Sequence, residues 1–168
     1  MNLERTKIEA YLDKSSYHLY IFDTVTSTNQ IVWDLLEEGK TPPIIAIASQ
    51  QTAGRGQWGR TWFSPPGGLY LSIGLKLQIA AKDAPHLTLF TAWGIANGLR
   101  SHQLPVKLKW PNDLILEGRK LGGIKSETRI QQGMITQGII GVGINWCNQV
   151  PETGIKIQSY QNPHQIKS

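Results

Sequence analysis

Apolar and polar residues alternate along much of this chain, which is the pattern of half-buried strands. In segment 18–25, for example, Leu19, Ile21 and Val25 fall on one side. The expected strands span 18–25, 44–48, 69–77, 106–110, 114–116, 120–129 and 134–144, with 155–158 as a further candidate. Glu117-Gly118-Arg119 predicts a tight hairpin between two of them.

Two segments have the apolar period of a helix instead. The first begins after Ser27, which we expect to cap it with Gln30 as the capping-box partner, and ends at Gly39. The second spans 85–101. The residues expected to face the core are Ile31, Val32, Leu35 and Leu36 in the first helix, and Ala92, Ile95, Ala96 and Leu99 in the second.

Helices are therefore few, and most strands follow one another directly along the chain. This order predicts an α+β fold with a mostly antiparallel sheet and with the helices packed on one face. No internal repeat or linker interrupts it, so we expect one domain over 1–168.

Composition narrows the class of protein. Hydrophobic residues make up 40% and charged residues 17% of the 168, which indicates a folded domain rather than a disordered one. The net charge of +5 suits an acidic partner such as a nucleotide, a nucleic acid or an acidic protein, although a merely basic soluble protein has the same charge. Cys147 is the one cysteine, which excludes an intramolecular disulfide and a Cys-rich metal site.

Neither a signal-peptide core in 1–12 nor an apolar run near the roughly 20 residues of a membrane span is present. We therefore expect a cytoplasmic protein that does not enter a membrane.

A glycine–arginine segment, Gly54-Arg55-Gly56-Gln57-Trp58-Gly59-Arg60-Thr61-Trp62, favours neither a strand nor a helix. Glycines let backbone N–H groups approach a ligand closely, and arginine presents a forked cation to carboxylate or phosphate. This composition is typical of a loop that folds over an anion, although a solvated surface turn has similar residues.

Two later segments, Lys109-Trp110-Pro111-Asn112-Asp113 and Lys120-Leu121-Gly122-Gly123-Ile124, place lysines and a carboxylate at strand ends. Taken separately, each also reads as an ordinary turn or hairpin base. Activation of a carboxylate by ATP needs fixed cations and N–H donors rather than an activated Ser or Cys, because the difficulty is accumulated negative charge. The sequence has no Ser-His-Asp motif, no P-loop and no His-rich zinc spacing.

These three segments in this order, from about Thr26 to Asn145, resemble the catalytic domain of biotin–protein ligases. The resemblance implies a fold like that of class II aminoacyl-tRNA synthetases and biotin synthetase. It also implies a ligase that uses ATP and Mg²⁺ to make biotinyl-5′-AMP and transfers biotin to a lysine of a biotin carboxyl carrier protein. The expected assembly is a monomer or a homodimer.

The same resemblance assigns roles to individual residues. The residues implied for biotin are Ser27, Thr28, Asn29, Gln51, Gly54, Arg55, Lys120 and Gly123. Those implied for the nucleotide are Arg55, Gln57, Arg60, Trp62, Lys109, Asn112 and Asn145. Catalysis is assigned to Lys120, Arg55, Lys109 and Asp113, with no metal ligand from the protein.

Three departures from the family pattern are visible. Gln57 and Trp58 stand where arginines are frequent. About 25 residues precede the Ser-Thr-Asn motif, so we expect no helix-turn-helix domain and no DNA binding. The chain ends soon after Asn145, so we expect a short catalytic domain without the family's C-terminal β-barrel domain.

Three other interpretations remain open. A lipoate or octanoyl ligase has a similar fold, but Gln51 and the Ser-Thr-Asn segment favour a ureido ring over an aliphatic chain. A basic nucleic-acid-binding protein fits the charge and Trp58 but lacks any such motif. An inactive remnant that still binds biotin fits the short C-terminus.

Overall fold

The computed structural model describes residues 5–10 and 17–160, so the expected domain bounds, 1–168, extend outside the described ranges. Its helices are α1 (Arg5–Glu9), α2 (Thr28–Glu37) and α3 (Ala84–Ser101), with short 3-10 turns η1 (Gln57–Gly59), η2 (Ala81–Asp83) and η3 (Ile157–Ser159). Its strands are β1 (His18–Val25), β2 (Ile44–Gln51), β3 (Leu69–Ala80), β4 (Lys107–Lys109), β5 (Asp113–Leu116), β6 (Arg119–Gln131) and β7 (Met134–Ile144).

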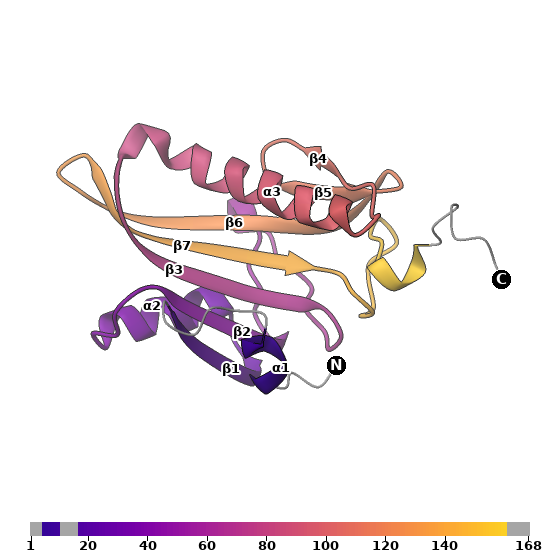
Figure 1. The fold of residues 1–168 in the computed structure, drawn as a ribbon, viewed down its shortest axis with the longest axis horizontal. Coiled ribbons are helices and arrows are strands. Elements are labelled where there is room, and N and C mark those ends of the chain that lie inside the picture. The colour runs from indigo at the N-terminus through magenta and orange to yellow at the C-terminus, as the bar shows by residue number, and fades with distance from the viewer. Residues whose placement is uncertain (1–4, 11–16, 161–168) are drawn as a thin grey trace.

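All seven strands form one sheet in the order β1-β2-β3-β7-β6-β5-β4 (Figure 1). β1 and β2 are parallel and are joined through α2, since parallel neighbours need a crossover. The other pairs are antiparallel. The predicted α+β class and mostly antiparallel sheet are confirmed.

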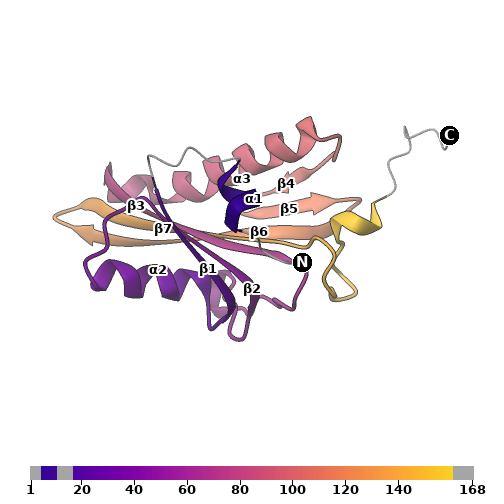
Figure 2. The ribbon, with the colours of Figure 1, turned by 60° about the horizontal axis from the view of Figure 1, so that its bottom comes forward.

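The expectation that the helices share one face is wrong. Val32 and Leu36 of α2 pack with Ile139 of β7, whereas Ala92 of α3 packs with Ile140, the next residue of β7. Successive residues of a strand point to opposite faces, so α2 and α3 cover opposite sides of the sheet (Figure 2). Residues 138–145 of this central segment are buried at every position, as a strand covered on both faces requires.

Turn residues behave as the sequence predicts in most places. Glu117 and Gly118 both have positive φ, which makes the tight β5–β6 hairpin, and Gly39 ends α2 with φ 83°. The expected strand at 155–158 is wrong, because Ile157 begins the 3-10 turn η3.

The beginning of α2 differs from the expected capping box. Ser27 occupies the N-cap position but makes no side-chain cap hydrogen bond. Gln30 instead donates to Asp34 and accepts from Arg55, while the Thr28 N–H donates to Gln51 Oε1 at 2.9 Å. A long-range side chain therefore satisfies this helix end, and it ties α2 to β2.

The helix pattern was otherwise correct. Val32 and Leu36 are buried, and Ile31 and Leu35 pack at the edge of the same cluster; Ala92 and Ala96 are buried on α3, with Ile95 and Leu99 beside them. None of the helices in the described ranges is long and apolar enough to cross a membrane.

Candidate active site

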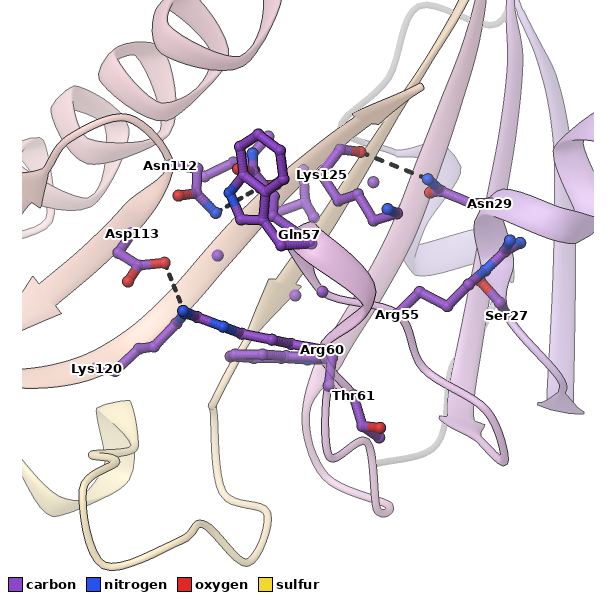
Figure 3. Close-up of a pocket in the computed structure, with 18 of the residues that line it drawn as sticks. Ser27, Asn29, Arg55, Gln57, Arg60, Thr61, Asn112, Asp113, Lys120 and Lys125 are labelled. Carbon is purple, nitrogen blue, oxygen red and sulfur yellow. Dashed lines mark hydrogen bonds and ion pairs between the residues drawn. The ribbon is translucent and has the colours of Figure 1, made fainter. Parts of the chain in front are cut away.

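A cavity of about 380 Å³ opens on the α2 side of the sheet (Figure 3). Its walls come from the start of α2, the end of β2, the glycine–arginine loop, the β4–β5 turn and the middle of β6 and β7. The sequence-predicted residues that line it are Ser27, Thr28, Asn29, Gln51, Arg55, Gln57, Arg60, Trp62, Lys109, Asn112, Asp113, Lys120 and Gly123. Three segments far apart in the sequence therefore meet around one space.

Lys120 and Asp113 form the charged centre of this cavity. Lys120 Nζ lies 2.6 Å from Asp113 Oδ1, and it lies 5.5 Å from the centre of the Trp62 ring (Figure 3). The Lys120 and Asp113 side chains are 37% and 20% exposed, so both remain accessible to a ligand. They come from neighbouring strands, β6 and β5, near the hairpin that joins them.

Asn145 and Gly54 do not line the cavity. Asn145 is buried, its Nδ2 donates to the Lys120 carbonyl at 3.4 Å, and the same carbonyl accepts from the Ile155 N–H at 3.0 Å. Asn145 thus holds the Lys120 backbone from behind. A Cβ at Gly54 would overlap the Trp62 carbonyl and the Ser64 hydroxyl. Glycine therefore allows the two ends of the loop to lie close together.

The glycine–arginine loop is a small hairpin beside the cavity. Arg55 and Thr61 form a bridge, and the Gly56 N–H donates to the Arg60 carbonyl at 2.6 Å. Gln57 Nε2 reaches the Ile124 carbonyl at 3.4 Å, which is a contact between the loop and β6. Trp58 has φ 57° and is 90% exposed, which is uncommon for a bulky residue.

A connected set of polar side chains forms the α2 end of the cavity. Gln51 Oε1 accepts from the Thr28 N–H, and Gln51 Nε2 donates to Ser64 Oγ at 2.8 Å. Ser72 Oγ lies 2.7 Å from Thr28 Oγ1 and 2.6 Å from Asn29 Oδ1. These contacts hold the Ser-Thr-Asn segment against β2 and β3.

Glu127 extends this set behind the cavity and was missed by the sequence analysis. Its Oε1 accepts from Asn29 Nδ2 at 3.0 Å and its Oε2 accepts from Trp33 Nε1 at 2.8 Å. Burial raises the pKa of Glu127, but the hydrogen bonds from Asn29 and Trp33 and the charges of Arg55 and Lys125 outweigh it and bring the pKa below its usual value. The carboxylate is therefore ionised near neutral pH.

The sequence analysis also missed Ser72, Lys125, Gly141 and Gly143. Glu127 and Lys125 fall on the same side of β6 as Gly123, so strand alternation is the signal that points them at the α2 face. A polar Ser72 within the apolar run of β3 is a similar signal.

Two glycines of β7 make room for the side chains above them. A Cβ on Gly141 would overlap the Asn29 amide, and one on Gly143 would overlap the indole nitrogen of Trp62. The Trp62 Nε1–H is buried beside the cavity and has no hydrogen-bond partner among the described residues. Such a donor in a cavity wall is suited to an acceptor on a ligand.

No group of three or more His, Cys, Asp or Glu side chains that could hold a metal ion occurs in the described part of the chain. The cavity instead gathers five cationic side chains, those of Arg55, Arg60, Lys109, Lys120 and Lys125, and a single carboxylate, that of Asp113. Its chemistry is therefore suited to an anionic ligand.

The chain is similar to proteins of known kind over most of its length. Residues 21–145 match the Biotin/lipoate A/B protein ligase family. Among curated proteins, the bifunctional ligase/repressor BirA of Escherichia coli is 38% identical over 160 residues, which are 94% of this chain and 49% of that protein. The Bacillus subtilis protein of the same name is 34% identical over 80% of this chain and 42% of its own length. The chain thus spans about half the length of these relatives.

Solved structures agree with the fold. A Leishmania major biotin protein ligase in complex with biotinyl-5-AMP has a TM-score of 0.68 at 27% identity, covering 84% of this chain and 63% of that one. An Aquifex aeolicus biotin protein ligase in complex with biotin and ATP has a TM-score of 0.62 at 31% identity, covering 80% and 55%. The expected biotin-synthetase-like fold is confirmed, and the chain belongs to the Biotin/lipoate A/B protein ligase family.

Proposed function

We propose that this chain activates biotin with ATP to form biotinyl-5′-AMP and then transfers the biotinyl group to a lysine of a biotin carboxyl carrier protein. The observation that carries the proposal is the meeting of Lys120, Asp113 and the cationic loop around one cavity, whose α2 end is lined by the hydroxyl and amide side chains of Ser27, Thr28, Asn29 and Gln51. Relatives described as biotin--[acetyl-CoA-carboxylase] ligase, and neighbours solved with biotinyl-5-AMP or with biotin and ATP, support it.

In the first step the biotin carboxylate oxygen attacks the α-phosphorus of ATP. A new O–P bond forms, the bond from the α-phosphorus to the bridging oxygen breaks, and pyrophosphate leaves. Lys120 and Arg55 stabilise the negative charge that gathers at this phosphorus, and Lys109 and Arg60 offset the charge of the departing group. Trp62 and Asn112 line the part of the cavity assigned to the nucleotide.

In the second step a lysine amine of the acceptor attacks the carbonyl carbon of the mixed anhydride. The new C–N bond replaces the C–O bond to AMP, and the amine loses a proton. Asp113 contacts the Lys120 ammonium, and in this proposal it orients the incoming amine or accepts its proton.

The α2 end of the cavity takes the ureido ring. Ser27, Thr28, Asn29 and Gln51 present hydroxyl and amide groups there, and these suit a ring with two N–H donors and one carbonyl acceptor better than an aliphatic chain. Lipoate is therefore the disfavoured substrate.

Mg²⁺ is the ion that usually accompanies ATP. Because the cavity offers the single carboxylate Asp113, the triphosphate oxygens would be the main ligands of the ion, and Asp113 would be the one lining carboxylate that could join them. The ion would supply neutralisation of phosphate charge. We place the reaction in the cytoplasm, where ATP and the acceptor meet.

The test is calorimetry of the purified chain with biotin and, separately, with lipoate, followed by biotin-dependent ATP–pyrophosphate exchange and mass measurement of a carrier domain. We expect biotin binding, exchange, and a mass increase of one biotinyl group. Tighter binding of lipoate than of biotin would overturn the substrate assignment. Biotin binding without exchange would instead indicate a binding remnant.

A further inference from the structure

A chain of hydrogen-bonded side chains runs from the cavity to Glu127 of β6, which contacts α2. It starts at Thr28, passes through Ser72 and Asn29, and ends at Glu127, which Trp33 holds from behind. Thr28 and Asn29 line the cavity, whereas Glu127 does not touch it. The mechanism above leaves Glu127 without a role.

Glu127 determines how the Asn29 amide is oriented. An ionised carboxylate only accepts, so Asn29 turns its Nδ2 toward it and its Oδ1 toward Ser72. The one hydroxyl proton of Ser72 then donates to Asn29 Oδ1. Thr28 Oγ1 lies 2.7 Å from Ser72 Oγ and 3.2 Å from Gln51 Oε1, so its one proton goes to one of these two oxygens and at least one lone pair stays free.

This polarity determines which hydrogen-bonding groups in the cavity remain free for a ligand. The second N–H of Asn29 Nδ2 lies 3.5 Å from the Lys125 carbonyl, so the uncommitted positions on Asn29 Oδ1 and Thr28 Oγ1 are lone pairs. Lone pairs accept from the N–H groups of a cyclic urea. A reversed Asn29 amide would present an N–H at the same place and would oppose those donors.

We propose that Glu127 is a positioning residue that fixes Asn29 and Thr28 as acceptors for the N–H groups of the ureido ring. The proposal deepens the proposed function and rests on it. Trp33 contributes by holding the second oxygen of the carboxylate, so that the first remains on Asn29. Glu127 acts through Asn29 and contacts no reacting atom.

The test compares Glu127→Gln with the parent enzyme in biotin-dependent ATP–pyrophosphate exchange. Gln has the same shape, but its amide can donate to Asn29, so the polarity of the chain is no longer imposed. We expect the KM for biotin to rise about tenfold, as for loss of a charge-assisted hydrogen bond, with kcat and the KM for ATP within about twofold. The matched control is Glu38→Gln, which removes an exposed carboxylate at the C-terminal end of α2 that does not line the cavity and should change neither KM.

A double-mutant cycle with Asn29→Ala separates positioning from general damage. If Glu127 acts through Asn29, Glu127→Gln should raise the KM for biotin less than about twofold in the Asn29→Ala background. Trp33→Phe keeps the carboxylate but removes one anchor, and it should raise the KM for biotin in the same direction if Glu127→Gln does not fold.

The outcomes are distinct. An equal rise in the KM for ATP, or a tenfold effect that persists without Asn29, would overturn the positioning role. An unchanged KM for biotin in Glu127→Gln would overturn it as well. If the parent enzyme itself fails to bind biotin, the proposed function fails instead.

Discussion

Lys120 Nζ lies 2.6 Å from Asp113 Oδ1, so the two groups that the proposed steps need are in contact. The Lys120 backbone is fixed from behind by Asn145 and Ile155. A cation held in place in this way loses little by reorganisation when the transition state forms. The contact also means that Asp113 is shared between Lys120 and the incoming amine.

Removal of the Lys120 charge should affect rate more than binding. Ground-state biotin brings one carboxylate, whereas the transition state adds the α-phosphate and the departing pyrophosphate. We expect Lys120→Ala to lower biotin-dependent ATP–pyrophosphate exchange by about 10²–10³, with a smaller loss of biotin affinity by calorimetry. Lys120→Arg should restore only part of the rate, because the planar fork has a different reach.

Lys107→Ala is the matched control, since Lys107 is an exposed residue of β4 that does not line the cavity. Lys109→Ala should show an intermediate loss. Exchange at the parental rate in Lys120→Ala would show that the ion pair with Asp113 is only structural.

Asp113→Asn should separate the two steps. The neutral amide keeps the shape but cannot accept a proton from the acceptor lysine. We expect transfer from isolated biotinyl-AMP to a carrier domain to fall by about 100-fold, with a much smaller loss in pyrophosphate exchange. Equal losses in both assays would assign Asp113 to holding Lys120 rather than to the amine.

The sequence was most informative where a local pattern decides the structure. β1 and β7 occupy the predicted residues, because each is a short apolar segment that polar or turn-forming residues follow. The 106–110 strand is shorter than expected, Lys107–Lys109, since it lies between two prolines that cannot donate to a ladder.

The predictions that were wrong concern contacts between residues that are distant in sequence. No local pattern shows on which face of the sheet a helix packs. The placement of α2 and α3 on opposite faces depends instead on β7, which is apolar on both faces. Gln30 fits a capping box by spacing, yet Arg55, 25 positions later, takes its side-chain oxygen.

The residues of the candidate site also fall into two groups, those that short motifs predict and those whose role depends on tertiary packing. Short motifs predicted the residues that line the cavity, such as Lys120 and Arg55. Ser72 and Glu127 belong to strands without a motif, and their role exists only after α2 packs over β3 and β6. Asn145 was expected to contact the nucleotide, but the structure places it behind Lys120 and not among the residues that line the cavity.

The glycine–arginine loop should become ordered on ligand binding. Its three internal backbone hydrogen bonds, donated by Gly56, Arg60 and Trp62, and a long contact from Gln57 are few for a segment with two like charges. We expect residues 54–64 to exchange amide hydrogen rapidly alone and slowly with biotin and ATP. Equal protection in both states would exclude ligand-dependent ordering, and β7, which is buried, is the internal control.

Glu127 should make stability depend on pH in a defined window. Asn29, Trp33, Arg55 and Lys125 face its carboxylate and keep its folded pKa below the usual value of 4.5. A lowered folded pKa stabilises the protein above pH 4.5, and this contribution is lost as the pH falls through the folded pKa.

We therefore expect the Tm difference between the parent and Glu127→Gln to be constant above about pH 5.5 and to shrink below pH 4.5. Thermal melts at a series of pH values measure it. A difference that stays constant down to pH 3 would mean that the charge of Glu127 contributes nothing to stability.

Gly143→Ala should displace Trp62 and so weaken nucleotide binding. The added methyl group would overlap the indole nitrogen, and β7 cannot move away because it pairs with both β3 and β6. Lys120 lies over the same ring, so the displaced indole also removes its cation–π contact. We expect the KM for ATP in pyrophosphate exchange to rise by about tenfold, as for loss of one stacked ring.

Gly98→Ala is the control, because nothing lies within 4 Å of its Cβ position and alanine should stabilise α3 by about 0.5–1 kcal/mol. If Gly143→Ala melts like the parent and keeps the parental KM for ATP, Trp62 does not bind the nucleotide, and its buried N–H needs another explanation.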